Sequence, residues 1–487
     1  MRRYLVLGFA AGLLVDAVCA AGRSGKPNVV IILADDLGYG DLRCYGHPVI
    51  RTPNLDRMAA EGIRFTSFYS AAPVCSPSRV GLLTGRNPNR AGVYDWIVEN
   101  GNRPARESRH LVHLRRSEVT LPKLFREAGY ATFMAGKWHC NTLFNSDAQP
   151  RPSDFGFDHW FATQNNAAPS HENPANFVRN GKAVEKLEGF SCNLVAREAV
   201  DWLEERAKSK SDQSFFLYLA LHEPHEQVAS PPALVKRYLP AARNEAEAQY
   251  FANVENLDAA VGDVLGALDR LGLSNDTLVI FTSDNGPETL DRAPGTQHSY
   301  GRPGPLRGMK GWTTEAGVRV PGIMRWPRRI KAGQVSAEPV SSLDLLPTLV
   351  ALAGAKVASN LDMDGADLRR VWSGGAVKRS RPLFWVYYHA FNDQVVAMRE
   401  GSWKILARLD GGSLPKINNV TEATAPGVRQ AKLTDVSLYN LAVDIGEATD
   451  LAGAETKRLR EMSAKLEKLY GEMTRTMYVW PDPKQPD

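Results

Sequence analysis

The amino-acid sequence predicts an α/β protein with one large, doubly wound sheet domain, followed by a small antiparallel sheet that carries one helix. Three observations lead to this prediction. Residues 28–34 form a run of mostly β-branched side chains, which is typical of a strand buried on both faces of a sheet. Strand-like and helix-like segments then alternate over about 350 residues. After the basic segment 378–382 the alternation stops and hairpin-like strands begin.

The expected elements of the large domain follow from apolar periodicity and from the residues that end each segment. Pro53 opens the first helix and Gly62 ends it. Gly129 separates a helix from the next strand, and Gly272 closes a long helix. The expected strands are 28–34, 130–134, 215–221, 277–282 and 318–326, and the expected helices are 54–61, 121–128, 194–208, 246–271 and 343–353.

The C-terminal part has a different composition. Segments 383–389, 394–399 and 403–408 look like hairpin strands, with a turn at Glu400-Gly401, and a helix is expected at 455–474. We therefore predict two units after the N-terminal segment. They are a large α/β domain over residues 22–377, where we look for a catalytic site below, and an α+β subdomain over residues 378–487.

The first residues predict export. Arg2 and Arg3 precede an apolar run over residues 4–15, which suits a signal-peptide core and is short for a membrane span. We predict a cleaved signal peptide over residues 1–21 and a secreted or periplasmic protein; a membrane anchor and, because of Cys19, a lipoprotein stay open. No other apolar run is long enough to cross a membrane. The net charge of +5 is too small and too dispersed to indicate a nucleic-acid-binding protein.

Hard oxygen ligands follow two of the predicted strands. Asp35 and Asp36 come directly after the first buried strand, and Asp284 and Asn285 follow the strand expected at 277–282. Ligand groups gather at the carboxyl ends of strands in α/β sheets, so these side chains are candidates for one Ca²⁺ or Mg²⁺ site. For either pair taken alone, a polar turn or a helix cap is the simpler interpretation.

Cys75 lies at a predicted helix start. Pro77 is followed by Arg79 and an apolar stretch, which predicts a helix with proline in its first turn and Cys75 just before its N-terminus. Backbone N–H groups and the helix dipole favour negative charge there, which would assist a nucleophile that attacks an anionic ester. A buried, unreactive cysteine beside a helix cap is the alternative.

Around these residues the sequence resembles the type I, formylglycine-dependent sulfatase family, which is arylsulfatase-like and part of the alkaline phosphatase superfamily. Residues 75–85 match the pattern C-x-P-S-R-x-x-x-L-T-G. Further family-like segments are 44–56, 129–139, 306–321 and 438–441. The resemblance extends from about residue 28 to residue 452, nearly the whole chain after the predicted signal peptide.

This resemblance implies a fold, a modification and a reaction. The implied fold is alkaline-phosphatase-like, a large mixed sheet flanked by helices with a smaller C-terminal antiparallel sheet plus helix. A formylglycine-generating or sulfatase-maturating enzyme is expected to oxidise Cys75 to formylglycine. The hydrate of this aldehyde attacks the sulfur of a sulfate ester and then releases sulfate by elimination. The expected substrate is a sulfated carbohydrate and the expected metal is Ca²⁺, with Mg²⁺ also possible.

The resemblance also assigns roles to residues. Arg79 supports the formylglycine hydroxyl, while Lys137 and Lys310 hold the sulfate group. His139 deprotonates the hydrate, and His225 protonates the leaving oxygen or contacts sulfate. His222 is a rival of His225, but the family pattern places the histidine directly after proline, as at Pro224-His225. The implied metal ligands are Asp35, Asp36, Asp284, Asn285 and the modified Cys75.

Two other functions fit parts of the pattern. One is a phosphomonoester or phosphonate hydrolase of the same superfamily, although the formylglycine motif argues against a plain phosphatase. The other is a non-catalytic glycan-binding relative, which would be expected to lack Cys75, Lys137 or His139.

Candidates for contacts with the rest of the substrate are less well defined. The family has a polar side chain between the two histidine motifs, facing the leaving group of the substrate. Thr163, Gln164 and Asn165 are candidates for it, and we do not choose among them. The basic segment 103–116 could attract a sulfated glycan, and segment 297–300 could contact sugar. A solvated basic loop is the alternative for the first of these two segments.

Overall fold

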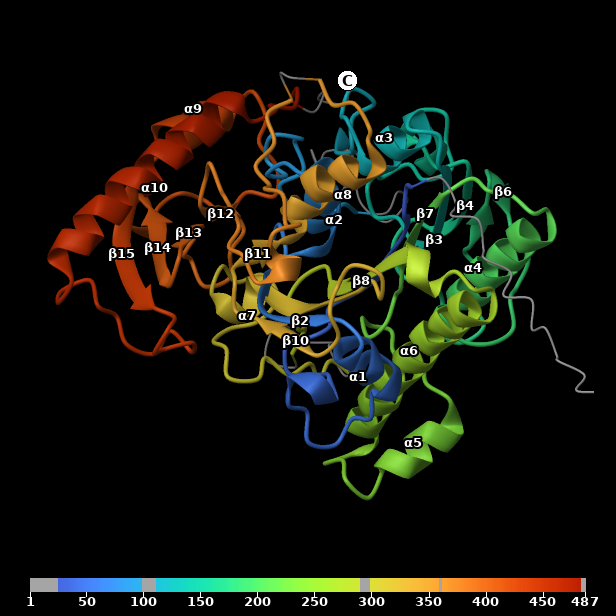
Figure 1. The fold of residues 1–487 in the computed structure, drawn as a ribbon. Coiled ribbons are helices and arrows are strands. Elements are labelled where there is room, and N and C mark those ends of the chain that lie inside the picture. The colour runs from blue at the N-terminus through green and yellow to red at the C-terminus, as the bar shows by residue number, and fades with distance from the viewer. Residues whose placement is uncertain (1–24, 99–110, 290–297, 359–360, 483–487) are drawn as a thin grey trace, which may run out of the picture.

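The computed structural model describes residues 25–98, 111–289, 298–358 and 361–482 (Figure 1). The predicted signal peptide, most of the basic segment 103–116 and Gln297 lie outside these ranges. Within them, no helix combines the length and the apolar character that crossing a membrane requires. The cysteines of these ranges form no disulfide with one another; they are Cys44, Cys75, Cys140 and Cys192.

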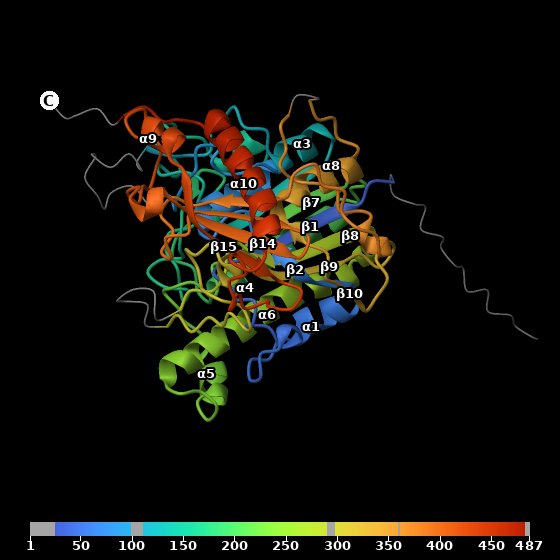
Figure 2. The same ribbon diagram turned by 90° about the vertical axis from the view of Figure 1, so that its left-hand side faces the viewer.

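A mixed sheet of eleven strands forms the centre of the described chain (Figures 1 and 2). The strands are β1 (Asn28–Ala34), β2 (Ile63–Tyr69), β3 (Ala131–Lys137), β4 (His159–Thr163), β5 (Val178–Arg179), β6 (Lys182–Ala183), β7 (Phe215–Ala220), β8 (Thr277–Ser283), β9 (Arg319–Arg325), β10 (Gln334–Ser336) and β11 (Val340–Ser341). Their order is β10-β2-β9-β8-β1-β7-β3-β4-β5-β6, and β11 also pairs with β2. Strands β8, β1, β7, β3 and β4 run parallel, whereas β9 is antiparallel to both of its neighbours.

Helices cover both faces of this sheet (Figure 1). One face carries α2 (Cys75–Thr84), α3 (Leu121–Glu127) and α8 (Leu345–Ala353), and the other carries α1 (Pro53–Ala60), α4 (Ser191–Lys208) and α6 (Glu245–Arg270). The short helix α5 (Pro232–Tyr238) packs on α6, and α7 (Glu315–Val318) precedes β9. In β1, Val29 and Ile31 pack toward the first face and Val30 and Ile32 toward the second. Burial on both faces explains why this strand is apolar throughout.

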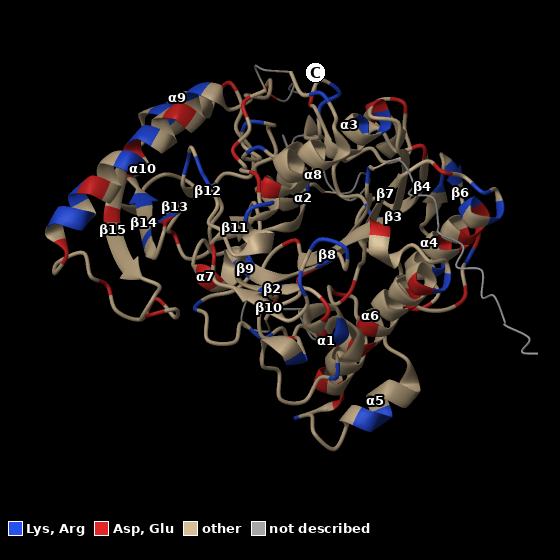
Figure 3. Ribbon diagram, viewed as in Figure 1, with Lys and Arg blue, Asp and Glu red and all other residues tan. Residues whose placement is uncertain are grey.

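The C-terminal part forms a separate antiparallel sheet. Its strands are β12 (Leu383–Val386), β13 (Val396–Glu400), β14 (Trp403–Leu409) and β15 (Leu433–Asn440), paired in that order. Helix α10 (Thr456–Thr476) packs across this sheet, and α9 (Ala425–Gln430) contacts α10 (Figure 2). The buried side of α10 carries Met462, Leu466, Tyr470 and Met473, a helical spacing, while acidic and basic residues are interspersed along its length (Figure 3).

The predicted fold class is confirmed, with a large mixed sheet flanked by helices and a small antiparallel sheet plus helix. Strands β2, β4 and β15 and the short strands β5, β6, β10 and β11 were not expected from the sequence. In β2 the polar Arg64, Thr66 and Ser67 interrupt the apolar run. Helix α2 begins at Cys75 itself and not after it. The N–H groups of the first helical turn have no partner within the helix, so a proline, which lacks this N–H, fits there. The helix can therefore start at Cys75, two residues before Pro77.

Candidate active site

The carboxyl ends of β1 and β8 bring the predicted oxygen ligands together. The two strands are parallel neighbours with Ala34 opposite Ser283, so the residues that follow them meet at one edge of the sheet. The backbone N–H of Asp36 donates to Oδ1 of Asp284 at 3.2 Å, and Nδ2 of Asn285 donates to Oδ1 of Asp36 at 2.7 Å. These polar side chains are buried, as is Asp35.

Cys75 lies against this cluster at the first position of α2. Its Sγ is 3.3 Å from Oδ1 of Asp35 and 3.8 Å from Oδ1 of Asp36. Burial raises the pKa of the Cys75 thiol well above its usual value and outweighs Lys137 and Lys310, which lower it. An unmodified Cys75 is therefore a protonated thiol near neutral pH, which makes it a poor nucleophile.

Arg79, one helical turn after Cys75, connects the two halves of the cluster. Its Nε and Nη2 contact Oδ2 of Asp284 at 2.9 and 2.7 Å, and Nη2 lies 3.5 Å from Oδ1 of Asp35. Nη1 donates to the backbone carbonyl of Lys137 at 2.9 Å. Burial lowers the pKa of Arg79, but the two carboxylates outweigh this effect and hold the pKa above its usual value. The guanidinium is fully buried and charged.

Two lysines neutralise the first pair of aspartates. Nζ of Lys137, the last residue of β3, lies 2.6 Å from Oδ2 of Asp35, and Nζ of Lys310 lies 2.7 Å from Oδ2 of Asp36. Burial raises the pKa of each aspartate. The lysines and other cations lower it by more, so both pKa values fall below the usual one. Lys310 also lies 3.2 Å from Oε2 of Glu288. Both aspartates are thus ionised.

Asp284 behaves differently from Asp35 and Asp36. Burial raises its pKa to about 7, and repulsion from the other two carboxylates adds to the effect, although Arg79 acts in the opposite direction. The carboxylates of Asp35 and Asp36 therefore repel a negative charge on Asp284. A divalent cation would relieve this repulsion.

The site combines carboxylate and amide oxygens with two softer donors, a thiol and an imidazole. Oxygens of Asp35 and Asp36, Sγ of Cys75 and a ring nitrogen of His225 lie within 4.8 Å of one another. In addition, Oδ1 of Asn285 is buried and has no hydrogen-bond partner in the described ranges, as expected of an oxygen that coordinates a cation. Carboxylate and amide oxygens are the ligands that Ca²⁺ and Mg²⁺ prefer.

The two predicted histidines lie beside the cluster. Nε2 of His139 contacts the carbonyl of Ile97 at 2.8 Å, and its buried Nδ1 has no partner among the described residues. Nε2 of His225 lies 3.5 Å from Oδ2 of Asp36. Burial lowers the pKa of His139 well below its usual value and lowers that of His225 to about 4, so both imidazoles are neutral at pH 7 in the free protein.

His222 occupies a different environment from His225. Its Nε2 contacts the hydroxyl of Thr163 at 2.8 Å, and its ring packs edge-on against Phe177. His222 is fully buried and does not line the cavity described next, whereas His225 does.

A cavity of about 440 Å³ opens onto the cluster. It is lined by Val74, Cys75, Asp95, Trp96, Ile97, Val98, His139, Asn165, His225, Lys310, Tyr387, His389 and Phe391. Of the three polar residues considered for substrate contacts, Asn165 lines this cavity and Thr163 and Gln164 do not. In segment 297–300, His298 and Ser299 contact Glu226, the residue after His225.

Several cavity residues were missed by the sequence analysis. They are Asp95 and Trp96, from the segment after α2, and Tyr387, His389 and Phe391, from the segment after β12. No motif marks them, because the two segments are almost three hundred positions apart and meet only in the folded chain. Asn166, whose Oδ1 lies 3.3 Å from Nζ of Lys137, was also missed, because no motif marks it.

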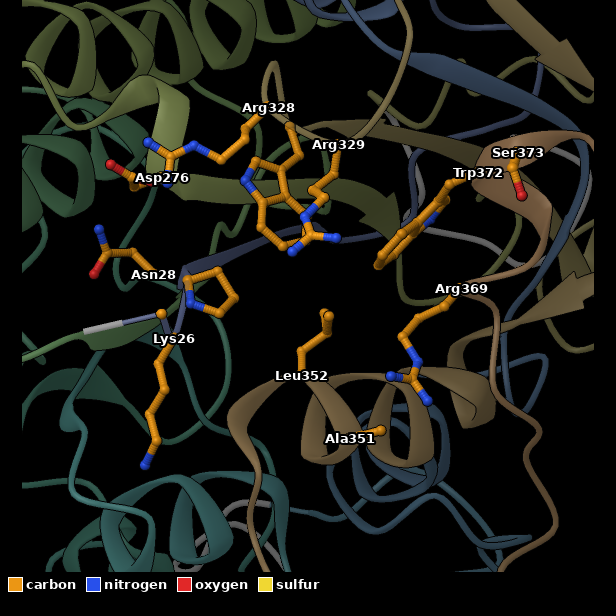
Figure 4. A pocket seen from close by; sticks show the side chains of 13 residues that line it. Lys26, Asn28, Asp276, Arg328, Arg329, Ala351, Leu352, Arg369, Trp372 and Ser373 are labelled. Carbon is orange, nitrogen blue, oxygen red and sulfur yellow. Dashed lines mark ion pairs between the residues drawn. The ribbon is translucent and has the colours of Figure 1, made fainter. Parts of the chain in front are cut away.

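A second cavity, of about 390 Å³, lies at the opposite edge of the sheet, where β1 and β8 begin (Figure 4). Asn28, Trp326 and Trp372 line it, and Arg328 pairs there with Asp276 (Figure 4). The predicted site residues, all of which lie in described ranges, do not contribute to it. The candidate active site is therefore the cavity that contains Cys75.

Comparison with known families identifies the class of protein. A family model described as "Sulfatase" matches residues 27–355, and one described as "N-sulphoglucosamine sulphohydrolase, C-terminal" matches residues 309–406. The chain is therefore a hydrolase of sulfuric esters. It belongs to the sulfatase family.

Individual relatives cover most of the chain. Arylsulfatase A from Homo sapiens is 36% identical over 497 residues, covering 96% of this chain and 90% of the relative. N-acetylgalactosamine-6-sulfatase from Canis lupus familiaris is 38% identical over 422 residues, covering 82% of this chain and 74% of the relative. The solved structure of Ps i-CgsB superposes with a TM-score of 0.76 at 28% identity, covering 93% of this chain and 95% of that one.

Proposed function

We propose that this sulfatase removes sulfate from a carbohydrate, using a formylglycine made from Cys75 and a bound Ca²⁺. The observation that carries the proposal is the position of Cys75. It starts a helix, lies 3.3 Å from Asp35 and faces a cavity that also contains Lys310, His139 and His225. A sulfate group in this cavity would meet a helix N-terminus and the ammonium group of Lys310, both of which favour an anion.

The state of the thiol supports the modification. With its pKa raised by burial, Cys75 itself is not suited to attack an ester. A formylglycine hydrate at this position supplies one hydroxyl as the nucleophile and a second hydroxyl whose deprotonation releases sulfate. Arg79 stays charged because it forms ion pairs with Asp284 and Asp35, and these contacts fix its guanidinium next to this position.

The residues around the cation site have separable roles. Asp35, Asp36, Asp284 and Asn285, together with the modified Cys75, would hold Ca²⁺, which neutralises charge on the sulfate oxygens. Lys137 and Lys310 bind the sulfate group by their ammonium groups.

Proton transfer falls to the two histidines. The neutral His139 can accept a proton at its unpartnered Nδ1. His225 must donate one to the leaving oxygen. Its pKa of about 4 in the free protein rises when an anion binds beside it, since an anion favours the protonated imidazole.

The carbohydrate part of the proposal is supported by relatives. One curated relative is named N-acetylgalactosamine-6-sulfatase, and Ps i-CgsB has been solved in complex with k-i-k-neocarrahexaose. A cavity of about 440 Å³ with aromatic and polar walls suits a sugar. The likeness to a phosphonate monoester hydrolase of Agrobacterium radiobacter, with a TM-score of 0.59 at 18% identity, reflects the shared fold alone. A non-catalytic role is disfavoured because Cys75, Lys137 and His139 are all present.

Mass spectrometry and a substrate panel test the proposal. The chain is co-expressed with a sulfatase-maturating enzyme, and the peptide that contains Cys75 is expected to carry an aldehyde. The matured protein is then assayed for sulfate release from 4-nitrophenyl sulfate and from sulfated mono- and disaccharides. Full activity with an unmodified Cys75 thiol would refute the proposal that formylglycine is the nucleophile. Activity on the aryl ester but on none of the sugars would refute the carbohydrate assignment and leave the sulfatase activity standing.

Export is a separate part of the proposal. We place it in residues 1–21, outside the described ranges, and N-terminal sequencing of the protein recovered outside the cytoplasm tests it. A mature protein that still begins with Met1 would contradict the cleaved signal peptide.

A further inference from the structure

One wall of the active-site cavity is built around a buried carboxylate. Oδ1 of Asp95 accepts hydrogen bonds from the backbone N–H of Trp96 and from the hydroxyl of Tyr387, both at 2.8 Å. Oδ2 of Asp95 lies 3.0 Å from Nδ1 of His389. The side chain of Asp95 is 2% exposed and that of His389 is 29% exposed. The carboxylate of Asp95 is thus buried behind His389, and the imidazole is the member of the pair that a ligand can contact.

The contact with Asp95 determines which nitrogen of His389 faces a ligand. A carboxylate accepts a hydrogen bond, so Nδ1 of His389 carries a hydrogen. Nε2 is then the nitrogen that remains for a ligand in the cavity. A hydroxyl group both donates and accepts hydrogen bonds, so Nε2 can form one with it.

The segment that carries His389 is fastened to the catalytic domain. The backbone N–H of Phe391 donates to the carbonyl of Gly311 at 3.0 Å, immediately after Lys310. The imidazole of His389 packs edge-on against the ring of Phe391, with ring centroids 5.5 Å apart. The indole N–H of Trp385, in β12, donates to the carbonyl of Ser70 at 2.9 Å. His389 therefore has a defined position relative to Lys310 and Cys75, although it comes from the C-terminal part of the chain.

We propose that His389 is a substrate-binding residue whose Nε2 forms a hydrogen bond with a hydroxyl of the sugar that carries the sulfate. Asp95 is its positioning residue. The inference rests on the proposed function, because it concerns the alcohol part of the same substrate. A sugar presents hydroxyl groups that an imidazole can recognise, and Trp96 and Phe391 on the same cavity give its C–H faces aromatic neighbours. The sulfate itself is left to Lys137 and Lys310.

Kinetics on two kinds of sulfate ester test the inference. His389→Phe keeps a ring and removes both nitrogens, and His389→Gln keeps a polar group that can partly replace Nε2. For the best sugar sulfate of the panel, His389→Phe is expected to raise KM about tenfold, the value of one hydrogen bond, with kcat changed by less than about twofold. His389→Gln is expected to recover part of the loss. For 4-nitrophenyl sulfate, which has no hydroxyl, neither variant changes KM by more than about twofold.

Asp95→Asn tests the positioning role. This change removes the fixed tautomer of His389, so it is expected to raise KM for the sugar sulfate by less than His389→Phe does. It adds nothing when combined with His389→Phe, because it acts only through the imidazole. A purely structural effect would instead lower kcat on both substrates and add in the double variant. His159→Phe is the matched control, since His159 is an exposed histidine outside this cavity.

Each outcome is decisive. If the parent enzyme hydrolyses both esters and His389→Phe leaves KM for the sugar sulfate unchanged, the inference is overturned and the proposed function stands. If the parent hydrolyses the aryl sulfate alone, the sugar assignment and the inference both fall while the sulfatase activity remains. If the parent hydrolyses neither ester after maturation is verified by mass spectrometry, the proposed function fails first.

Discussion

Replacing Lys404 by methionine tests how the C-terminal sheet is held against α7. Lys404 lies in β14 and its side chain is fully buried. Its Nζ is 2.9 Å from Oε1 of Glu315, the first residue of α7, and 3.1 Å from Oε1 of Glu447. Methionine has a similar length and flexibility, so the change removes the charge and keeps most of the packing.

The expected cost follows from the environment of Glu315. Burial raises its pKa, but Lys404 and then Arg319 and Arg399 outweigh burial and lower the pKa from 4.5 to about 2. At about 1.4 kcal/mol for each tenfold change, this difference corresponds to about 3 kcal/mol of favourable interaction for the charged form. Arg319, at 3.0 Å, and the hydroxyl of Tyr69, at 2.7 Å, remain in the variant. Removing one partner of a buried pair costs about 3–5 kcal/mol, so we expect a loss of about 3 kcal/mol.

Urea unfolding, followed by circular dichroism, measures this loss as a change in the free energy of unfolding. Lys465→Met is the matched control, because Lys465 pairs with Glu400 at 2.7 Å while both side chains are about half exposed. That control is expected to cost less than about 1 kcal/mol. If Lys404→Met costs no more than Lys465→Met, the buried network does not fasten the sheet and the reasoning is wrong.

Three further predictions concern the site and the same network. Cys75→Ala is expected to abolish sulfate release and leave the melting temperature nearly unchanged; substantial residual turnover would count against a nucleophile at this position. Chelation of Ca²⁺ by EDTA is expected to lower both activity and melting temperature, because Asp35, Asp36 and Asp284 then repel one another, and an unaltered melting temperature would argue against the ion. The lowered pKa of Glu315 contributes stability above pH 4.5 that is lost as the pH falls toward 2, so unfolding free energy should drop there in the parent and less in Glu315→Gln.

Much of the fold and site was predictable because its signals are local. The apolar run of β1 follows from burial on both faces, and the polar residues after β1 and β8 follow from the way parallel strands end together. The helix that starts at Cys75 is marked by Pro77 within two residues. Each of these features depends on neighbours in sequence or on a general rule of sheet geometry.

Neighbouring residues alone determined the type of the strongly apolar strands and of the long helices, and the groups that could carry chemistry. The tertiary structure decided which of these groups meet. It placed His225 in the cavity and His222 in the core, paired Arg79 with Asp284, and brought Asp95 beside His389. Contacts between residues hundreds of positions apart leave no local pattern, because they depend on how the whole sheet is ordered and on how the C-terminal sheet packs against it.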